Sequence, residues 1–461
     1  MAGWYNYTVR YRRWTVDQER LFPQVPEGET TPVPLGAPNT RRSDARLYQP
    51  VRNQVEMVMV MRDLDSLLPE DHLARAIWKV VESFDFSAFY APIKAVIGEP
   101  GHPATDPQVL VALWIYATAE GVGKARQLDR LCNEHDAYRW LRGGVPINYH
   151  LLSDFRVAHR EALDALMTRI LAAMMAEGLV SLDRVAQDGM RVRASAGAGS
   201  FRREGKLKEL LAKAEAQVKS LSAQVDEPEE AKSEPSQRDV AARERAARER
   251  QERIEQALKE LPEVRAAKKT AEERQNARVS TTDPEARVMK MADGGFRPAF
   301  NVELATDTKS QVIVGVGVIN RGTDMDQASP MLAKIEERAE KTPHDYLADG
   351  GFATLGEVDR MAAAGVTFYA PTRAPRGDSR SQTEPRPEDS PDVAAWRLRM
   401  GTDEAKVIYK ERAATAECVN AQARCRHALY QFVVRGLDKV TCVVLWMAIT
   451  HNLLRWIALK G

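Results

Sequence analysis

The first sustained pattern along the chain is helical and covers residues 64–178. Asp106 and Pro107 precede the apolar run 108–119, as a helix cap followed by proline at the first helical position. Further helices are predicted over 125–133, 136–141 and 148–175. Short helices separated by glycine turns are typical of a helix-turn-helix, and equally of other small α-domains.

Residues 202–278 carry a second helical pattern, in which charged residues dominate. Their 77 positions hold 19 Lys or Arg and 17 Asp or Glu. Apolar residues recur at helical spacing over 207–221 and again over 240–261, and the polar segment 226–236 separates the two runs. We therefore predict two long antiparallel helices joined by a polar turn. A fully solvated charged helix, or disorder, is the alternative interpretation.

On both sides of this charged segment the apolar residues recur with a period of two, as in β-strands. Strands are predicted over 182–194, 298–307, 311–320, 344–349 and 366–371. Helices are predicted over 326–341, 354–364, 394–427 and 437–459. Three consecutive strands followed by alternating helices and strands make a mixed α/β sheet with helices on its faces, which is the element order of a ribonuclease-H-like domain.

Length and composition indicate a globular chain. Its 461 residues are 44% hydrophobic and 28% charged, which suffices for two or three domains. The four cysteines include no CxxC pair, so we expect neither disulfides nor a cysteine-bound zinc, as in a reducing cytoplasm. No apolar stretch approaches the ~18 residues of a membrane span and no signal-peptide pattern opens the chain, which argues against membrane insertion and secretion. Residues 1–55 lack any period and are predicted to form an extended, mostly disordered arm.

Three carboxylates from remote parts of the chain are candidates for one site. Asp188 lies in the first predicted strand, Asp349 ends the fourth, and Glu417 lies on the helix after the last strand. Because the carboxyl ends of strands meet at one sheet edge, these side chains would converge to bind two Mg²⁺ or Mn²⁺ ions. The alternatives are a turn at Asp188-Gly189, a capping role for Asp349, and a solvated residue or arginine partner at Glu417.

Charge is balanced over the whole chain but not at its C-terminal end. The 66 Lys and Arg face 65 Asp and Glu, so no global basic excess predicts nucleic acid or an anionic membrane. Residues 406–461, in contrast, hold nine Lys or Arg and three Asp or Glu, a local net charge of +6. Glu417 and Arg424, seven residues apart, share a helix face, so a phosphate at the carboxylate would meet a cation. Ordinary solvated cations are the alternative.

Five stretches of the chain combine these features: VAQDGMRVRASAG, MKMADGGFRPAFNVELATD, YLADGGFATLGEV, RMGTDEAKVIYKERAATAECVNAQAR and VRGLDKVTCVVLWMAITHNLLR. Together they resemble the DDE transposases of bacterial insertion sequences, in the branch with a long helical insertion after the first strand. The resemblance covers about residues 55–461. It implies that Asp188, Asp349 and Glu417 are the three acidic positions of that family.

The same resemblance concerns the neighbours of Glu417. Tyr409, Arg412 and Arg424 match the family's Y-R-E-K signature, whose residues contact DNA. This chain departs from the signature twice. Four residues rather than three separate Arg412 from Glu417, and Arg424 replaces the usual lysine, which changes the geometry of a phosphate contact.

The resemblance implies a ribonuclease-H-like catalytic domain over 181–461, interrupted by the helical insertion at 202–278, and a helical DNA-binding domain over 56–180. In the helical domain, four arginines are candidate phosphate contacts: Arg126, Arg130, Arg156 and Arg160. They lie on segments compatible with a helix-turn-helix. The implied reaction is metal-dependent cleavage at the element's inverted-repeat ends, followed by attack of the freed 3′-hydroxyl on target DNA. Two ends must meet, so we expect a homodimer or larger oligomer on DNA.

Two other interpretations stay open at this point. A transposase-derived DNA-binding protein without catalysis would have the same fold and the same basic region. A coiled-coil scaffold would explain residues 202–278 alone, but it leaves the predicted strands and the three carboxylates unexplained.

Overall fold

The computed structural model describes residues 63–95, 103–225, 236–372 and 381–460. They all fall within one compact unit of the chain. The arm predicted over residues 1–55 lies outside the described residues, as does nearly all of the polar turn predicted at 226–236.

Short helices form the N-terminal part of the described chain. They are η1 (Asp65–Leu67), α2 (Leu73–Glu82), α3 (Ser87–Tyr90), α4 (Pro107–Ala119), α5 (Ala125–Glu134), α6 (Asp136–Arg142), α7 (Tyr149–Ala158) and α8 (Arg160–Ala176). Asp106 caps α4 as predicted, because its side chain accepts a hydrogen bond from the Gln108 backbone N–H at 2.9 Å. The single helix predicted over 148–175 is wrong: the backbone of His159, with a ψ of 46°, leaves the helical region and separates α7 from α8.

Six strands form one mixed sheet: β1 (Arg184–Arg193), β4 (Arg287–Lys290), β5 (Phe296–Asp307), β6 (Ile313–Ile319), β7 (Asp345–Leu347) and β8 (Thr367–Tyr369). β5 runs antiparallel to β1, β4 and β6, whereas β7 is parallel to both β1 and β8. The five predicted strands are therefore confirmed, and β4 is an addition to them. This order is consistent with a ribonuclease-H-like domain.

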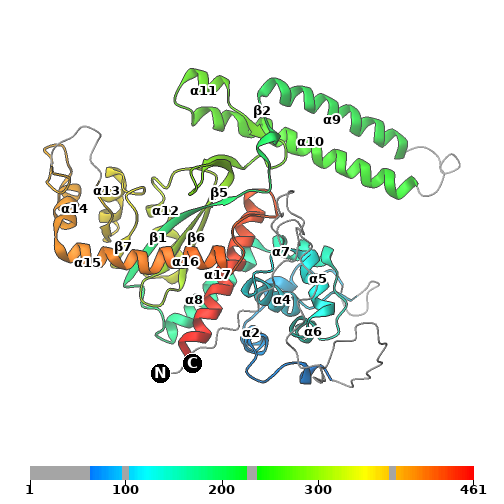
Figure 1. Cartoon of the computed structure of the whole chain (residues 1–461), viewed down its shortest axis with the longest axis horizontal. Coiled ribbons are helices and arrows are strands. Elements are labelled where there is room, and N and C mark those ends of the chain that lie inside the picture. The colour runs from blue at the N-terminus through cyan, green and yellow to red at the C-terminus, as the bar shows by residue number, and fades with distance from the viewer. Residues whose placement is uncertain (1–62, 96–102, 226–235, 373–380, 461) are drawn as a thin grey trace, which may run out of the picture. The chain divides into compact units, whose positions relative to one another are not determined.

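Helices pack on the sheet as the alternating pattern requires. α12 (Ala328–Ala339) contacts β6, and α13 (Leu355–Ala363) contacts β8. The helices after β8 are α14 (Pro391–Gly401), α15 (Asp403–Arg412), the π-helical turn η4 (Ala413–Glu417), α16 (Cys418–Cys425) and α17 (Leu437–Lys460). α15, η4 and α16 follow one another without a break as one long helical stretch (Figure 1). The η4 turn contacts β1 and β5 in the middle of the sheet.

α17 joins the N-terminal helices to the sheet. It contacts α4, α7 and α8 as well as β6. Trp446 Nε1 donates a hydrogen bond to the Arg156 carbonyl at 3.0 Å, and the Asn452 amide pairs with the backbone of Ile313 at 2.8 Å. One hydrophobic core therefore runs across residue 180, the boundary predicted between the two domains.

The length and apolar composition of α17 contradict the prediction that no stretch of the chain is long and apolar enough to span a membrane. This helix is long and apolar enough to cross a membrane, whereas the sequence pattern predicted no such stretch. However, 72% of its apolar window is buried inside the protein, as in the core helix of a soluble protein.

The charged segment forms the predicted pair of long helices, which lie side by side in Figure 1. It comprises β2 (Phe201–Arg202), α9 (Glu204–Val225), α10 (Ser236–Ala266), α11 (Ala271–Gln275) and β3 (Val279–Ser280). Arg265, near the end of α10, pairs with Glu204 at the start of α9 at 2.6 Å, so the helices are antiparallel. β2 pairs with β3 where the chain leaves and rejoins the sheet domain. A small apolar cluster between the helices, with Leu207, Ile254 and Leu261 at its centre, is separate from the main core.

Candidate active site

Asp188 lies in the middle of β1, so the alternative of a turn at Asp188-Gly189 is wrong. Its side chain is 18% exposed and faces the helical stretch from α15 to α16. Oδ1 accepts a hydrogen bond from Arg412 Nη2 at 2.8 Å, and Oδ2 accepts one from Asn420 Nδ2 at 2.9 Å. Burial raises the pKa of Asp188, while Arg412 and Asn420 oppose that shift by stabilising the carboxylate.

Arg412 connects Asp188 with Glu417. Its Nη1 donates to Glu417 Oε1 at 3.0 Å, so one guanidinium binds a carboxylate from β1 and another from its own helix. Burial disfavours the charged guanidinium, but the surrounding carboxylates, including that of Asp349, raise the pKa of Arg412. All three candidate carboxylates therefore act on the same cation.

The π-helical turn η4 accommodates the unusual spacing of Arg412 and Glu417. In an α-helix, five residues advance the chain by about 500°, so the two side chains would lie about 140° apart around the axis. A π turn is wider and takes up one extra residue. Glu417 thereby returns to the face of Arg412, and the additional residue between them does not separate their side chains.

Asp349 follows β7 and opens the turn at Gly350-Gly351. Its Oδ1 accepts a hydrogen bond from the Gly351 backbone N–H at 2.5 Å, so the capping alternative holds for this oxygen. A Cβ atom at residue 351 would lie 2.6 Å from the same oxygen, which means that only glycine leaves the carboxylate where it is. Besides burial, the like charge of Asp349 raises the pKa of Asp188.

Asp188, Asp349 and Glu417 do not form a preassembled metal site in this structure. Among the described residues, no group of three His, Cys, Asp or Glu side chains is spaced to hold an ion. Arg412 instead binds one oxygen each of Asp188 and Glu417. Hard carboxylate oxygens are the ligands that Mg²⁺ prefers, so these side chains have the right chemistry to bind a divalent cation. Such a cation would neutralise the carboxylates in place of Arg412.

Tyr409 and Arg424, the other two signature residues, flank these carboxylates along the helical stretch. Tyr409 is half-buried in a small apolar cluster with Ala186 and Leu347, and burial raises the pKa of its phenol. It is therefore a neutral hydrogen-bond donor. Arg424 is half-buried on α16 and forms no ion pair with any other described residue.

Asn420 is the residue of this site that the sequence interpretation missed. It is 7% exposed, and its amide holds Asp188 Oδ2. The available signal was its position three residues after Glu417, which places a buried amide on the same helix face as the carboxylate.

Three of the four candidate arginines in the N-terminal helices lie at the surface: Arg126, Arg130 and Arg160. The guanidinium of Arg126 stacks over the Tyr149 ring, 4.8 Å from its centroid. Arg130 and Arg160 form exposed ion pairs with Glu134 and Asp438. Such exposed pairs contribute little free energy, so a DNA phosphate can compete with them.

Arg156 differs from these three arginines because it is 8% exposed. Its guanidinium stacks on Trp114 at 4.6 Å and donates to the Gly123 carbonyl at 2.5 Å. Burial lowers the pKa of Arg156 to about 10. This position inside the helical core does not suit a phosphate contact, so Arg156 has no part in the DNA contacts proposed below.

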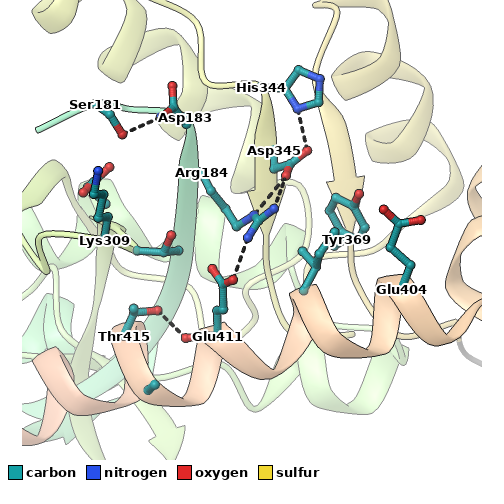
Figure 2. A pocket seen from close by; sticks show the side chains of 14 residues that line it. Ser181, Asp183, Arg184, Lys309, His344, Asp345, Tyr369, Glu404, Glu411 and Thr415 are labelled. Carbon is teal, nitrogen blue, oxygen red and sulfur yellow. Dashed lines mark hydrogen bonds and ion pairs between the residues drawn. The ribbon is translucent and has the colours of Figure 1, made fainter.

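A cavity of about 890 Å³ lies by the beginnings of β1 and β7, and none of the three candidate carboxylates lines it. Arg184 stands in its wall between Asp345 and Glu411, at 2.8 and 2.7 Å (Figure 2). These ion pairs tie α15 to both strands. The ion pairs in the cavity wall therefore help to hold that helix on the sheet.

Comparison with known protein families gives two matches. Residues 62–158 match the family described as "Transposase domain (DUF772)", which corresponds to η1 and helices α2–α7. Residues 372–457 match the family described as "Transposase DDE domain", which includes the helical stretch with Arg412 and Glu417. No curated protein and no solved structure matches the chain. These two transposase matches, one toward each end of the chain, and the sheet order between them, which is consistent with a ribonuclease-H-like domain, support an insertion-sequence DDE transposase.

Proposed function

We propose that this chain cleaves phosphodiester bonds at the ends of its insertion sequence and joins them to target DNA, with Mg²⁺ or Mn²⁺. The observation that carries the proposal is the pair of contacts made by Arg412, to Asp188 at 2.8 Å and to Glu417 at 3.0 Å. They bring two of the three candidate carboxylates together from distant parts of the chain. The Glu417 side chain is 54% exposed, so this group of residues is open to a DNA strand from solvent.

Each residue has a separate task in this proposal. Asp188, Asp349 and Glu417 bind the metal ions, which when bound activate the attacking oxygen and stabilise the leaving oxygen. Asn420 orients Asp188 through its hydrogen bond to Oδ2. Tyr409 positions a phosphate as a neutral donor. Arg412 and Arg424 balance the charge of the phosphate, because a guanidinium binds its oxygens through two N–H groups.

Replacing each carboxylate in turn tests the proposal. Asp188→Asn, Asp349→Asn and Glu417→Gln should each abolish Mg²⁺-dependent strand cleavage of DNA carrying the element's ends, while retention of that DNA stays nearly unchanged. Each change removes a metal ligand but no phosphate contact. The control is Asp403→Asn on α15, whose carboxylate is 98% exposed and pairs only with Lys406 among the described residues. Wild-type cleavage by any of the three variants would remove that residue from the site.

A second candidate function is DNA binding without catalysis. The observation that favours it is the lack, among the described residues, of three ligands spaced for a metal ion, with Arg412 bound to two of the carboxylates. The two functions differ in one measurement. A protein that retains the element's ends but never nicks them in Mg²⁺ or Mn²⁺ would be the non-catalytic form.

A further inference from the structure

The loop between β5 and β6, residues 308–312, contacts the helical stretch of the candidate active site. Gln311 Nε2 donates a hydrogen bond to the Ala414 carbonyl at 3.1 Å. Ala414 lies in η4, the wide turn that returns Glu417 to the face of Arg412. A side chain from the sheet therefore binds the backbone of the turn on which the geometry of the site depends.

The Ala414 carbonyl needs a donor because η4 is not an α-helix. In an α-helix this carbonyl would accept from the backbone N–H of Cys418, four residues further on. Here the Cys418 N–H bonds to the Thr415 carbonyl instead. The amide of Gln311 supplies a donor in its place. Thr415 supports the turn from within, since its Oγ1 donates to the Glu411 carbonyl at 2.8 Å.

The backbone of Gln311 has a conformation that does not favour glutamine. Its φ is 59°, in the left-handed region that residues other than glycine rarely adopt. Glycine would adopt this backbone without strain. The loop conformation therefore does not account for a glutamine here, whereas the hydrogen bond to Ala414 requires a long side chain with a donor at its end.

The most buried helix of the chain holds this loop in place. His451 Nε2 on α17 donates to the Gln311 carbonyl at 2.8 Å, and Arg455 Nε donates to the Ser310 carbonyl at 2.9 Å. Where the loop enters β6, the Ile313 backbone N–H donates to Asn452 Oδ1 at 2.8 Å. Because the backbone of the loop is fixed in this way, the Gln311 amide is presented to η4 from a rigid support.

We propose that Gln311 is a positioning residue, whose amide keeps η4 wide and thereby holds Glu417 beside Arg412 and Asp188. Without this amide, the Ala414 carbonyl gains by recovering the Cys418 N–H, which tightens the turn into α-helix. Five α-helical residues advance the chain by about 500°, so Glu417 would turn away from Arg412. The inference rests on the proposed function where it concerns metal binding by Glu417; the effect on the turn does not.

Hydrogen exchange of the full chain, without DNA or metal, tests the effect on the turn. Gln311→Gly should speed exchange over residues 412–418 by about fivefold, the change in population that one neutral hydrogen bond controls. Its melting temperature should stay near the wild-type value, because relief of the positive φ offsets the lost bond. Gln311→Asn, one methylene shorter, should speed exchange equally, whereas Gln311→Lys again offers a long donor and should restore slow exchange.

Glu340→Gly is the matched control. Glu340 also has a positive φ, of 50°, but it caps the C-terminal end of α12. This variant should gain the same relief of backbone strain and leave exchange over residues 412–418 unchanged.

The Mg²⁺ requirement of cleavage tests the effect on the site. The Mg²⁺ concentration for half-maximal strand cleavage should rise at least twofold in Gln311→Gly and stay unchanged in Glu340→Gly. Loss of folded protein alone would lower the rate without this shift. Deleting Ala414 makes the turn ordinary α-helix, so adding Gln311→Gly to that deletion should change neither exchange nor the Mg²⁺ requirement.

Wild-type exchange over residues 412–418 in Gln311→Gly would overturn the inference. Faster exchange with an unchanged Mg²⁺ requirement would overturn the positioning of Glu417. An equal effect of Gln311→Gly with and without Ala414 would show that the glutamine does not act through the wide turn. Absence of cleavage by the wild-type chain would contradict the proposed function instead, and the exchange rates would still decide whether Gln311 holds η4.

Discussion

The two longest helical elements of the described chain, α17 and the hairpin of α9 and α10, contribute to the fold in opposite ways. α17 has 24 residues, and nearly every side chain from Val440 to Leu453 is buried against the N-terminal helices and the sheet. α10 is longer, with 31 residues, yet it buries only a thin apolar stripe against α9. Helix length therefore does not indicate how much of the core a helix supports.

Polar contacts differ in the same way. Those of α17 are buried hydrogen bonds to distant backbone groups, such as Trp446 to the Arg156 carbonyl. Those of the hairpin are largely ion pairs within one helix, such as Lys213 with Glu209 at 2.7 Å, with the lysine side chain 66% exposed. Exposed pairs of this kind contribute little free energy of unfolding. The hairpin is therefore attached to the core rather than part of it.

Truncating the centre of α17 should have the largest effect on stability. Trp446 is fully buried and its indole is hydrogen-bonded, so Trp446→Ala should lower the free energy of unfolding by about 3–5 kcal/mol. Urea denaturation measures this loss. Leu459→Ala, at a 38% exposed position near the end of the same helix, is the control and should cost under about 1 kcal/mol. Equal losses in the two variants would contradict the central role of α17.

Lowering the pH should have the second-largest effect on stability, and it should act on α17 rather than on the hairpin. His451 of α17 is 2% exposed and donates from Nε2 to the Gln311 carbonyl, and burial lowers its pKa to about 4. The unfolded chain binds this proton near pH 6.5, so stability is full above that pH. It falls by about 3 kcal/mol as the pH drops to 4. Urea denaturation at pH 7 and pH 4.5 measures the effect.

His451→Gln should remove that part of the pH dependence, whereas His344→Gln, with a side chain 80% exposed, should keep it. The hairpin contains no histidine, so histidine protonation should not change its stability over this pH range. A wild-type pH profile in His451→Gln would show that other groups cause the acid sensitivity.

Removing the hairpin should have a small effect on the core. β2 and β3 already join its two ends, so replacing Arg203 to Arg278 by a short Gly/Ser linker should leave a cooperatively melting protein. The deletion removes the ion pair of Glu260 on α10 with Arg287 on β4, at 2.6 Å. We expect the free energy of unfolding to fall by about 1 kcal/mol, together with loss of DNA-end pairing or strand transfer. If the deletion variant does not fold, the hairpin is part of the core and the prediction is wrong.

The smallest expected change concerns the surface of the N-terminal helices. If Arg126 and Arg130 contact phosphates, replacing both by Gln should weaken binding to all DNA sequences alike and reduce the salt slope by roughly two units. Fluorescence anisotropy over a range of salt concentrations measures this slope. Arg139→Gln on α6, where the arginine pairs with Asp136, is the control. An unchanged slope would leave dimerisation as the task of these helices.

The sequence predicted the strands and most helices because their periods follow directly from which face is buried. It missed the break at His159, because the apolar period continues across it. It also missed the burial of Arg156, which depends on Trp114 from another helix. In the candidate site, the three carboxylates could be proposed from the sequence, but the contact that Asp188 and Glu417 share with Arg412 could not. That contact depends on the π-helical turn η4, which no local sequence pattern predicted.

The η4 turn has a consequence for how this gene can change. A codon inserted between Arg412 and Glu417 would ordinarily rotate everything downstream and destroy the site, yet a wide turn absorbs it locally. The two alanines at 413 and 414 are exposed, so the surplus residue lies on the outside of the helix. Deleting the codon for Ala414 should therefore restore ordinary α-helix and keep Glu417 beside Arg412. We therefore expect the chain to tolerate one residue more or less at this turn without a compensating mutation elsewhere.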